Sequence, residues 1–154
     1  MNIFVLDLNP TKAVKYHNDR HCVKMILETT QLLSTALPYL DQGRAGPYKS
    51  THLNHPCSVW TRTCRGNYHW LWKLGIALCE EYTFRYGKIH KCEAYLRDLR
   101  LSKSNPRKMT PFAQAMPEQY RNSNAVKAYR AYYRGEKRHL AKWTNREMPY
   151  WWDR

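Results

Sequence analysis

Six polar side chains recur at helical spacing near the N-terminus and include residue types that transfer protons and bind polar substrates. At about 100° per residue they lie on one narrow strip. The members of this strip are His17, His21, Lys24, Glu28, Gln31 and Thr35. Apolar residues flank the strip and cover the rest of the helix, which is the inverse of an ordinary surface helix. We interpret the strip as the wall of a cleft; the alternative is a surface pair of Lys24 and Glu28 with two histidines at its edge.

A long helix must carry this strip. Residues 17–37 contain neither Gly nor Pro, and Pro38 follows, so we predict a helix that ends there. A second long helix is predicted over residues 68–86, with Asn67 as its cap, Gly87 at its end and an apolar stripe that we interpret as core. The remaining expected helices are 10–16, 56–65, 89–101 and a basic one over 124–143, with a polar connection over 102–116 that contains Arg107.

The opening residues 2–6 are short and apolar, and they form either a brief strand or an extended segment packed in the core. The fold class we predict is mainly α: a single compact helical domain over residues 1–154 with a short extended N-terminal segment. No apolar run approaches the length of a membrane span. The five cysteines lack C-x-x-C spacing and no signal peptide precedes them, so reduced thiols and a cytoplasmic location are expected.

The loop before residue 58 raises the question of a metal. His52, His55, Cys57 and Cys64 are types that bind zinc, but their spacing lacks the paired ligands of a structural site. We therefore expect ordinary loop histidines, no metal and no cofactor.

The net charge of +14 is concentrated in the second half of the chain, where residues 85–154 hold 17 Lys and Arg against 6 Asp and Glu. A half that basic suits a polyanionic partner, and interleaved aromatic residues make nucleic acid the first candidate. Phosphate contact and base stacking are expected from Lys127, Arg130, Arg134, Arg138, Trp143, Trp151 and Trp152. A solvated basic face with aromatic packing remains the alternative.

The residues Asp19, His21 and Glu28 form the pattern D-x-H-x6-E on the first long helix. This pattern resembles the phage-type pyrimidine-dimer DNA glycosylases with AP-lyase activity, which are small basic helical proteins of similar length. Weaker likenesses follow in order at residues 67–87, at residues 116–118 and in the aromatic C-terminus. The opening residues and the stretch 17–25 also resemble uncharacterised small phage proteins, which implies the cytoplasm of a host cell.

The resemblance implies an α-amine nucleophile that attacks C1′ of the sugar, forms a Schiff base and leaves strand cleavage to β-elimination. Because Asn2 is too large for ready removal of the preceding methionine, this amine would belong to Met1. An α-amine has an ordinary pKa near 8, so part of it is neutral at cellular pH. Glu28 would stabilise the cationic intermediate and transfer protons, with His21 as its helper or as a phosphate ligand. Substrate contacts are expected from His17, Lys24, Gln31 and Asn2.

Three functions remain open at this stage. The preferred one is a DNA N-glycosylase, with AP-lyase activity as a further step, that acts on damaged or modified bases. The others are a hydrolase or binder of a small nucleotide in the same cleft, and a non-catalytic nucleic-acid-binding protein. A closed pocket too small for duplex DNA would favour the second function, and a shallow or uncharged site around Glu28 the third. A monomer is expected.

Overall fold

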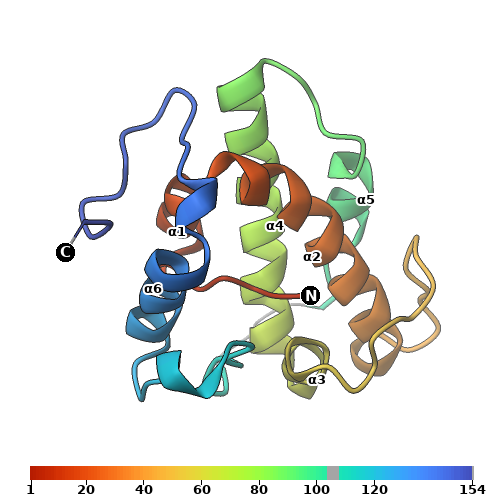
Figure 1. The fold of residues 1–154 in the computed structure, drawn as a ribbon. Coiled ribbons are helices and arrows are strands. Elements are labelled where there is room, and N and C mark those ends of the chain that lie inside the picture. Colours follow the sequence, from red (N-terminus) through yellow and green to blue (C-terminus); the bar gives the residue numbers. More distant parts are fainter. Residues whose placement is uncertain (104–107, 154) are drawn as a thin grey trace.

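Helix α4, Arg65–Tyr86, is the element against which most other helices pack, and it stands at the centre of Figure 1. The computed structural model describes residues 1–103 and 108–153; Arg107 of the polar connection lies outside them. The helices that contact α4 are α1 (Pro10–Tyr16), α2 (Asp19–Leu40), α3 (Pro56–Thr63) and α5 (Glu93–Asp98). The described residues form no strand, so the predicted mainly α class is confirmed.

The core lies between α2 and α4. Leu33 and Leu37 of α2 and Leu71, Leu74 and Leu78 of α4 are all buried, so the apolar stripe of the second long helix is core as predicted. No helix in the described part of the chain combines the length and apolarity needed to cross a membrane.

The N-terminal residues have no regular structure and run into the interior between α2 and α6, Ala125–Glu136 (Figure 1). Val5 and Leu6 are fully buried, and the ring of Phe4 contacts His21 of α2 and Tyr133 of α6. The segment is therefore packed in the core as predicted, but it has irregular backbone and is not a strand.

Both long helices differ from prediction at one end. Helix α2 continues through Pro38 to Leu40, so the proline lies within its last turn and does not end it. Helix α4 begins at Arg65, so Asn67 lies inside its first turn and is not its cap. The Asn67 amide group instead donates to the Trp60 carbonyl at 2.8 Å, a tertiary contact that sequence position does not reveal.

Two later helices are shorter than predicted. Helix α5 spans only Glu93–Asp98, and α6 ends at Glu136, followed by a 3-10 turn at Arg138–Leu140. The tail beyond α6 is held by distant partners: the Trp143 indole donates to the Tyr16 carbonyl at 3.0 Å. The chain after α6 therefore leaves the axis of that helix, although its sequence would allow further helical turns.

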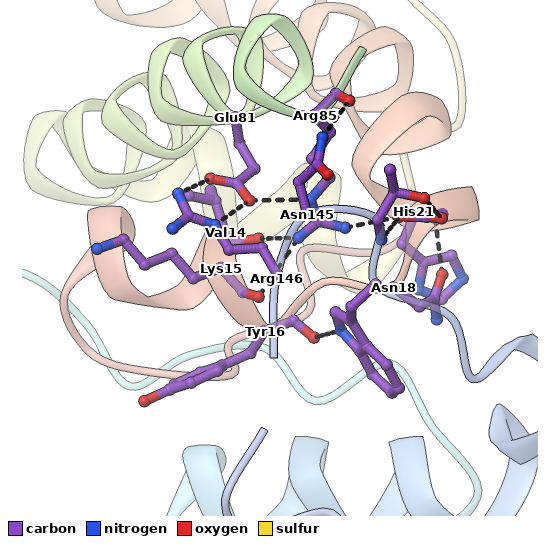
Figure 2. Close-up of polar contacts among 12 residues, drawn as sticks. Val14, Lys15, Tyr16, Asn18, His21, Glu81, Arg85, Asn145 and Arg146 are labelled. Atoms are coloured by element: carbon purple, nitrogen blue, oxygen red, sulfur yellow. Dashed lines mark hydrogen bonds and ion pairs between the residues drawn. The ribbon is translucent and has the colours of Figure 1, made fainter. Parts of the chain in front are cut away.

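A buried ion network ties the tail to α2 and α4 (Figure 2). Arg85 donates to Glu81 at 2.9 Å and to Asp19 at 3.1 Å, while Arg146 from the tail donates to both oxygens of Glu81 at 2.9 Å. Burial alone would raise the pKa of Glu81, but the hydrogen bonds from Arg146 and Arg85 outweigh it and lower that pKa. Thr144 also donates to Asp19, so the first turn of α2 is held from two sides.

Candidate active site

A small cleft opens where the N-terminal segment passes between α2 and α6. Its volume is about 160 Å³. Its lining residues are Met1, Asn2, Phe4, His21, Lys24, Met25, Glu28, Tyr132 and Lys137. The middle of the polar strip on α2 therefore faces a cleft, as the inverted pattern predicts.

The carboxylate of Glu28 faces the start of the chain. Its Oε2 accepts a hydrogen bond from the Asn2 backbone N–H at 3.2 Å and lies 3.7 Å from the α-amine of Met1. Its Oε1 pairs with Lys24 Nζ at 3.3 Å. The carboxylate side chain is only 12% exposed, whereas the Lys24 side chain is 61% exposed. An amine held beside a shielded carboxylate can act as a nucleophile once it is deprotonated, with the carboxylate there to stabilise a cationic adduct.

His21 lies in the wall of the cleft as a neutral imidazole. Burial is the main cause that lowers its pKa to about 3; repulsion from His17, once that ring is protonated at low pH, and from Lys137 adds to the effect. Its Nδ1 is 2.6 Å from the Tyr133 hydroxyl, and its ring stacks on Phe4 with centroids 4.3 Å apart. A neutral ring does not attract phosphate as a cation, so the phosphate-ligand alternative for His21 has no electrostatic basis in this structure.

The two ends of the polar strip do not reach the cleft. His17 is fully buried, and its Nδ1 donates to the Ala13 carbonyl at 2.9 Å. Burial lowers the pKa of His17 to about 4, so it is a neutral core residue and the prediction that it contacts substrate is wrong. Gln31 is half-buried one turn beyond Glu28 and does not line the cleft, and Thr35 is buried.

Four residues that sequence reasoning did not assign to the site complete the cleft: Phe4, Met25, Tyr132 and Lys137. Lys137 Nζ lies 5.1 Å from the centroid of the Tyr132 ring. Lys137 follows α6 and is more than 100 positions from Glu28, so helical periodicity carried no signal for it. The only available hint was the concentration of charge in the second half of the chain.

The four cations expected to contact phosphate lie on α6 or just after it, and their side chains have different surroundings. Lys127 is exposed, and Arg138 is exposed with a 3.5 Å ion pair to Asp153. Arg130 instead donates to the Leu6 carbonyl at 2.9 Å, and Arg134 donates to the Trp151 carbonyl at 3.0 Å. These two arginines hold the N-terminal segment and the tail, whereas the sequence had led us to expect all four cations to contact phosphate.

Two of the three tryptophans predicted to stack on bases lie in the protein interior. Trp151 and Trp152 are only 4% and 3% exposed, and Trp143 is half-buried with its indole bonded to the chain. Their rings pack against one another and against Tyr133, so burial leaves Trp151 and Trp152 no free face for a base.

The loop histidines are engaged locally. His52 Nδ1 lies 2.8 Å from the Thr51 hydroxyl, and His55 Nδ1 accepts the Cys57 backbone N–H at 3.1 Å. Among residues 1–103 and 108–153, no three His, Cys, Asp or Glu side chains gather in a way that could hold a metal ion.

Comparison with known proteins adds one finding to this geometry. Neither a curated protein nor a solved structure matches the chain significantly. A family model described as pyrimidine dimer DNA glycosylase matches residues 1–102, which include α2, Glu28 and the N-terminal segment but not Tyr132 or Lys137. Since the match covers about two thirds of the sequence, the chain belongs to the pyrimidine dimer DNA glycosylase family.

Proposed function

We propose that the protein is a DNA glycosylase with AP-lyase activity that acts on pyrimidine dimers through the α-amine of Met1. Family membership supports the glycosylase role. The observation that carries the proposal is the 3.7 Å separation between this amine and Glu28 Oε2 inside a cleft.

The reaction follows from an amine placed beside a carboxylate. The neutral amine attacks C1′ of the target deoxyribose, the C1′–N bond to the base breaks, and the base leaves with the electron pair and gains a proton. The adduct nitrogen loses a proton, and the sugar ring opens as O4′ leaves C1′ with the bonding electron pair and gains a proton. The product is an iminium ion, which the Glu28 carboxylate stabilises electrostatically. Removal of a C2′ proton then expels the 3′ phosphate by β-elimination, and water releases the amine.

The contacts of Glu28 suit this role because its two oxygens have different partners. Oε2 faces the backbone nitrogens of Met1 and Asn2, while Oε1 is held by Lys24. The carboxylate is thereby fixed toward the amine, and Oε2, the oxygen nearest the amine, is placed to accept a proton from it and return it.

The size of the cleft favours a macromolecular substrate over a free nucleotide. At about 160 Å³ the cleft is smaller than the roughly 300–1,000 Å³ of sites that enclose small molecules. Lys24 and Lys137 line the cleft beside the amine, and their positive charge suits a substrate that carries phosphate groups.

The same carboxylate would serve a chain that starts one residue later. If Met1 were removed, the nitrogen of Asn2 would become the α-amine, and it lies 3.2 Å from Oε2. The large side chain of Asn2 disfavours that removal, so Met1 is the nucleophile we propose. The mass of the purified protein distinguishes the two starting points.

Borohydride trapping tests the proposal. Purified protein is incubated with duplex DNA that contains a pyrimidine dimer or an abasic site, reduced, and digested so that the modified peptide can be identified by mass spectrometry. We expect an adduct at the N-terminal amine, and its loss in Glu28→Gln. The control is Glu80→Gln, which changes an exposed glutamate on α4 and should trap normally. Intact DNA with no adduct, or an adduct at a lysine side chain, would refute the proposal.

A further inference from the structure

The backbone of Phe4 has a conformation that its side chain does not favour. Its φ is +31°, in the left-handed region that bulky residues rarely occupy. The other two non-glycine residues with positive φ among those described are His52 and Asn145, types that adopt it more readily. Backbone strain of this kind persists only where the surrounding structure imposes it, and it is found most often at functional sites.

The surroundings that impose it are aromatic. The Phe4 ring is 5% exposed and stacks on His21 at 4.3 Å with 23° between the planes. Tyr133 meets its edge at 5.3 Å, and Tyr132 lies parallel to it at 6.2 Å. His21 is itself fixed by the Tyr133 hydroxyl at 2.6 Å, so the ring on which Phe4 stacks has one orientation.

The residues between Phe4 and the amine are held as well. Asn2 donates through its side-chain amide to the Ala115 carbonyl at 2.8 Å and accepts the Ile3 N–H at 2.8 Å. Because both ends of this short segment are fixed, the torsion at Phe4 sets the direction from which Met1 reaches Glu28.

We propose that Phe4 is a positioning residue for the nucleophile: its stack on His21 maintains the strained backbone that holds the N-terminal amine at the Glu28 carboxylate. The effect of Phe4 on catalysis rests on the proposed function. Its effect on the position of the amine rests on the contacts alone. The proposal also gives His21 a role that a neutral, buried imidazole can perform: its ring supports the Phe4 ring, and Phe4 positions the amine.

The kinetic test compares Phe4→Leu with Phe112→Leu. Phe112 is a half-buried ring that packs on Trp60 and Trp70 and does not line the cleft, so it matches the substitution and tests for simple loss of packing. At saturating abasic DNA, Phe4→Leu should slow adduct formation by roughly 10- to 100-fold, the scale expected for a displacement of about 1 Å. The Kd for an uncleavable abasic analogue should stay unchanged, and Phe112→Leu should retain the wild-type rate.

A double-mutant cycle tests the stack itself. If Phe4 and His21 act through one contact, His21→Leu should slow trapping similarly, and the double variant should be no slower than either single variant. The inference would be overturned if the rate reductions of the two single variants multiplied in the double variant. It would also be overturned if Phe4→Leu formed the adduct at the wild-type rate, or if Phe112→Leu slowed adduct formation as much as Phe4→Leu.

A second readout does not depend on catalysis. The Asn2 amide proton bonds to Glu28 only while the segment is held, so its hydrogen exchange, followed by NMR, should accelerate in Phe4→Leu and His21→Leu but not in Phe112→Leu. Unchanged exchange would refute the positioning role even if wild-type protein formed no adduct. Failure of wild type to form an adduct, with exchange accelerated as expected, would refute the proposed function alone.

Discussion

The two buried histidines should make stability fall steeply below neutral pH. His17 and His21 have pKa values lowered to about 4 and about 3, mainly by burial, whereas an unfolded histidine titrates near pH 6.5. Between these values the unfolded state binds protons that the folded state does not, so stability decreases as the pH falls from about 6.5. The loss from His17 is complete near pH 4, where its imidazole protonates in the folded protein too.

The magnitude follows from the pH interval. At pH 5 an unfolded histidine is about 1.5 pH units below its pKa, which corresponds to about 2 kcal/mol of stabilisation of the unfolded state. His17 and His21 remain neutral in the folded state at this pH, so together they should remove about 4 kcal/mol between pH 7 and pH 5. For a protein of ordinary stability this is a large part of the total.

The variant that isolates one of these contributions is His17→Asn. The asparagine amide can replace Nδ1–H as the donor to the Ala13 carbonyl, and it does not titrate. Free energies of unfolding are measured in urea at pH 7, 6 and 5 and constant ionic strength. We expect the loss between pH 7 and pH 5 to be about 2 kcal/mol smaller in His17→Asn than in wild type, whatever the variant costs at pH 7.

Exposed His139 provides the matched control, because His139→Asn should keep the full wild-type loss. If the pH dependence of His17→Asn equals that of wild type, the reasoning is refuted, because His17 is then not the buried neutral imidazole that the structure describes.

Two further variants test the ion network and the DNA surface. Arg85→Met leaves Asp19 and Glu81 in the interior with fewer partners and should cost roughly 3–5 kcal/mol in urea unfolding; a loss below about 1 kcal/mol would show that water replaces the arginine. Arg138→Ala removes an exposed cation and should reduce the slope of log binding constant against log salt concentration by about 0.9. Trp151→Ala should instead cost roughly 3–5 kcal/mol of stability with no change in that slope, because its ring is buried. A changed slope would show that Trp151 contacts DNA.

Local sequence was sufficient to predict most helices and the cleft-facing strip. The core stripe of α4 follows from helical periodicity, and α1 begins at Pro10 with Asn9 as its cap. The inverted pattern on α2 pointed to a cleft, and Lys24 and Glu28 do line one. These inferences succeed because periodicity and capping act over one or two helical turns.

The errors have a common physical cause. Helical spacing placed His17 and Glu28 on one strip of α2, and the sequence grouped Arg130 with Arg138 as phosphate contacts. Residues from distant parts of the chain determine what surrounds His17 and Arg130. Helix ends shifted for the same reason, because Asn67 found a tertiary partner in Trp60. Periodicity specifies a face of a helix, and it does not specify what covers that face.

The amino-acid sequence by itself thus determined the mainly α fold, the basic second half and a carboxylate on a predominantly apolar helix. The family resemblance implied that Glu28 acts with the N-terminal amine, and the tertiary structure brings the two together. Only the tertiary structure decided that Lys137 completes their cleft and that His21 is neutral. Each of these depends on residues more than 20 positions apart being brought within a few ångströms of one another. Burial and electrostatic environment arise from that packing, and they decide which side chains can take part in chemistry.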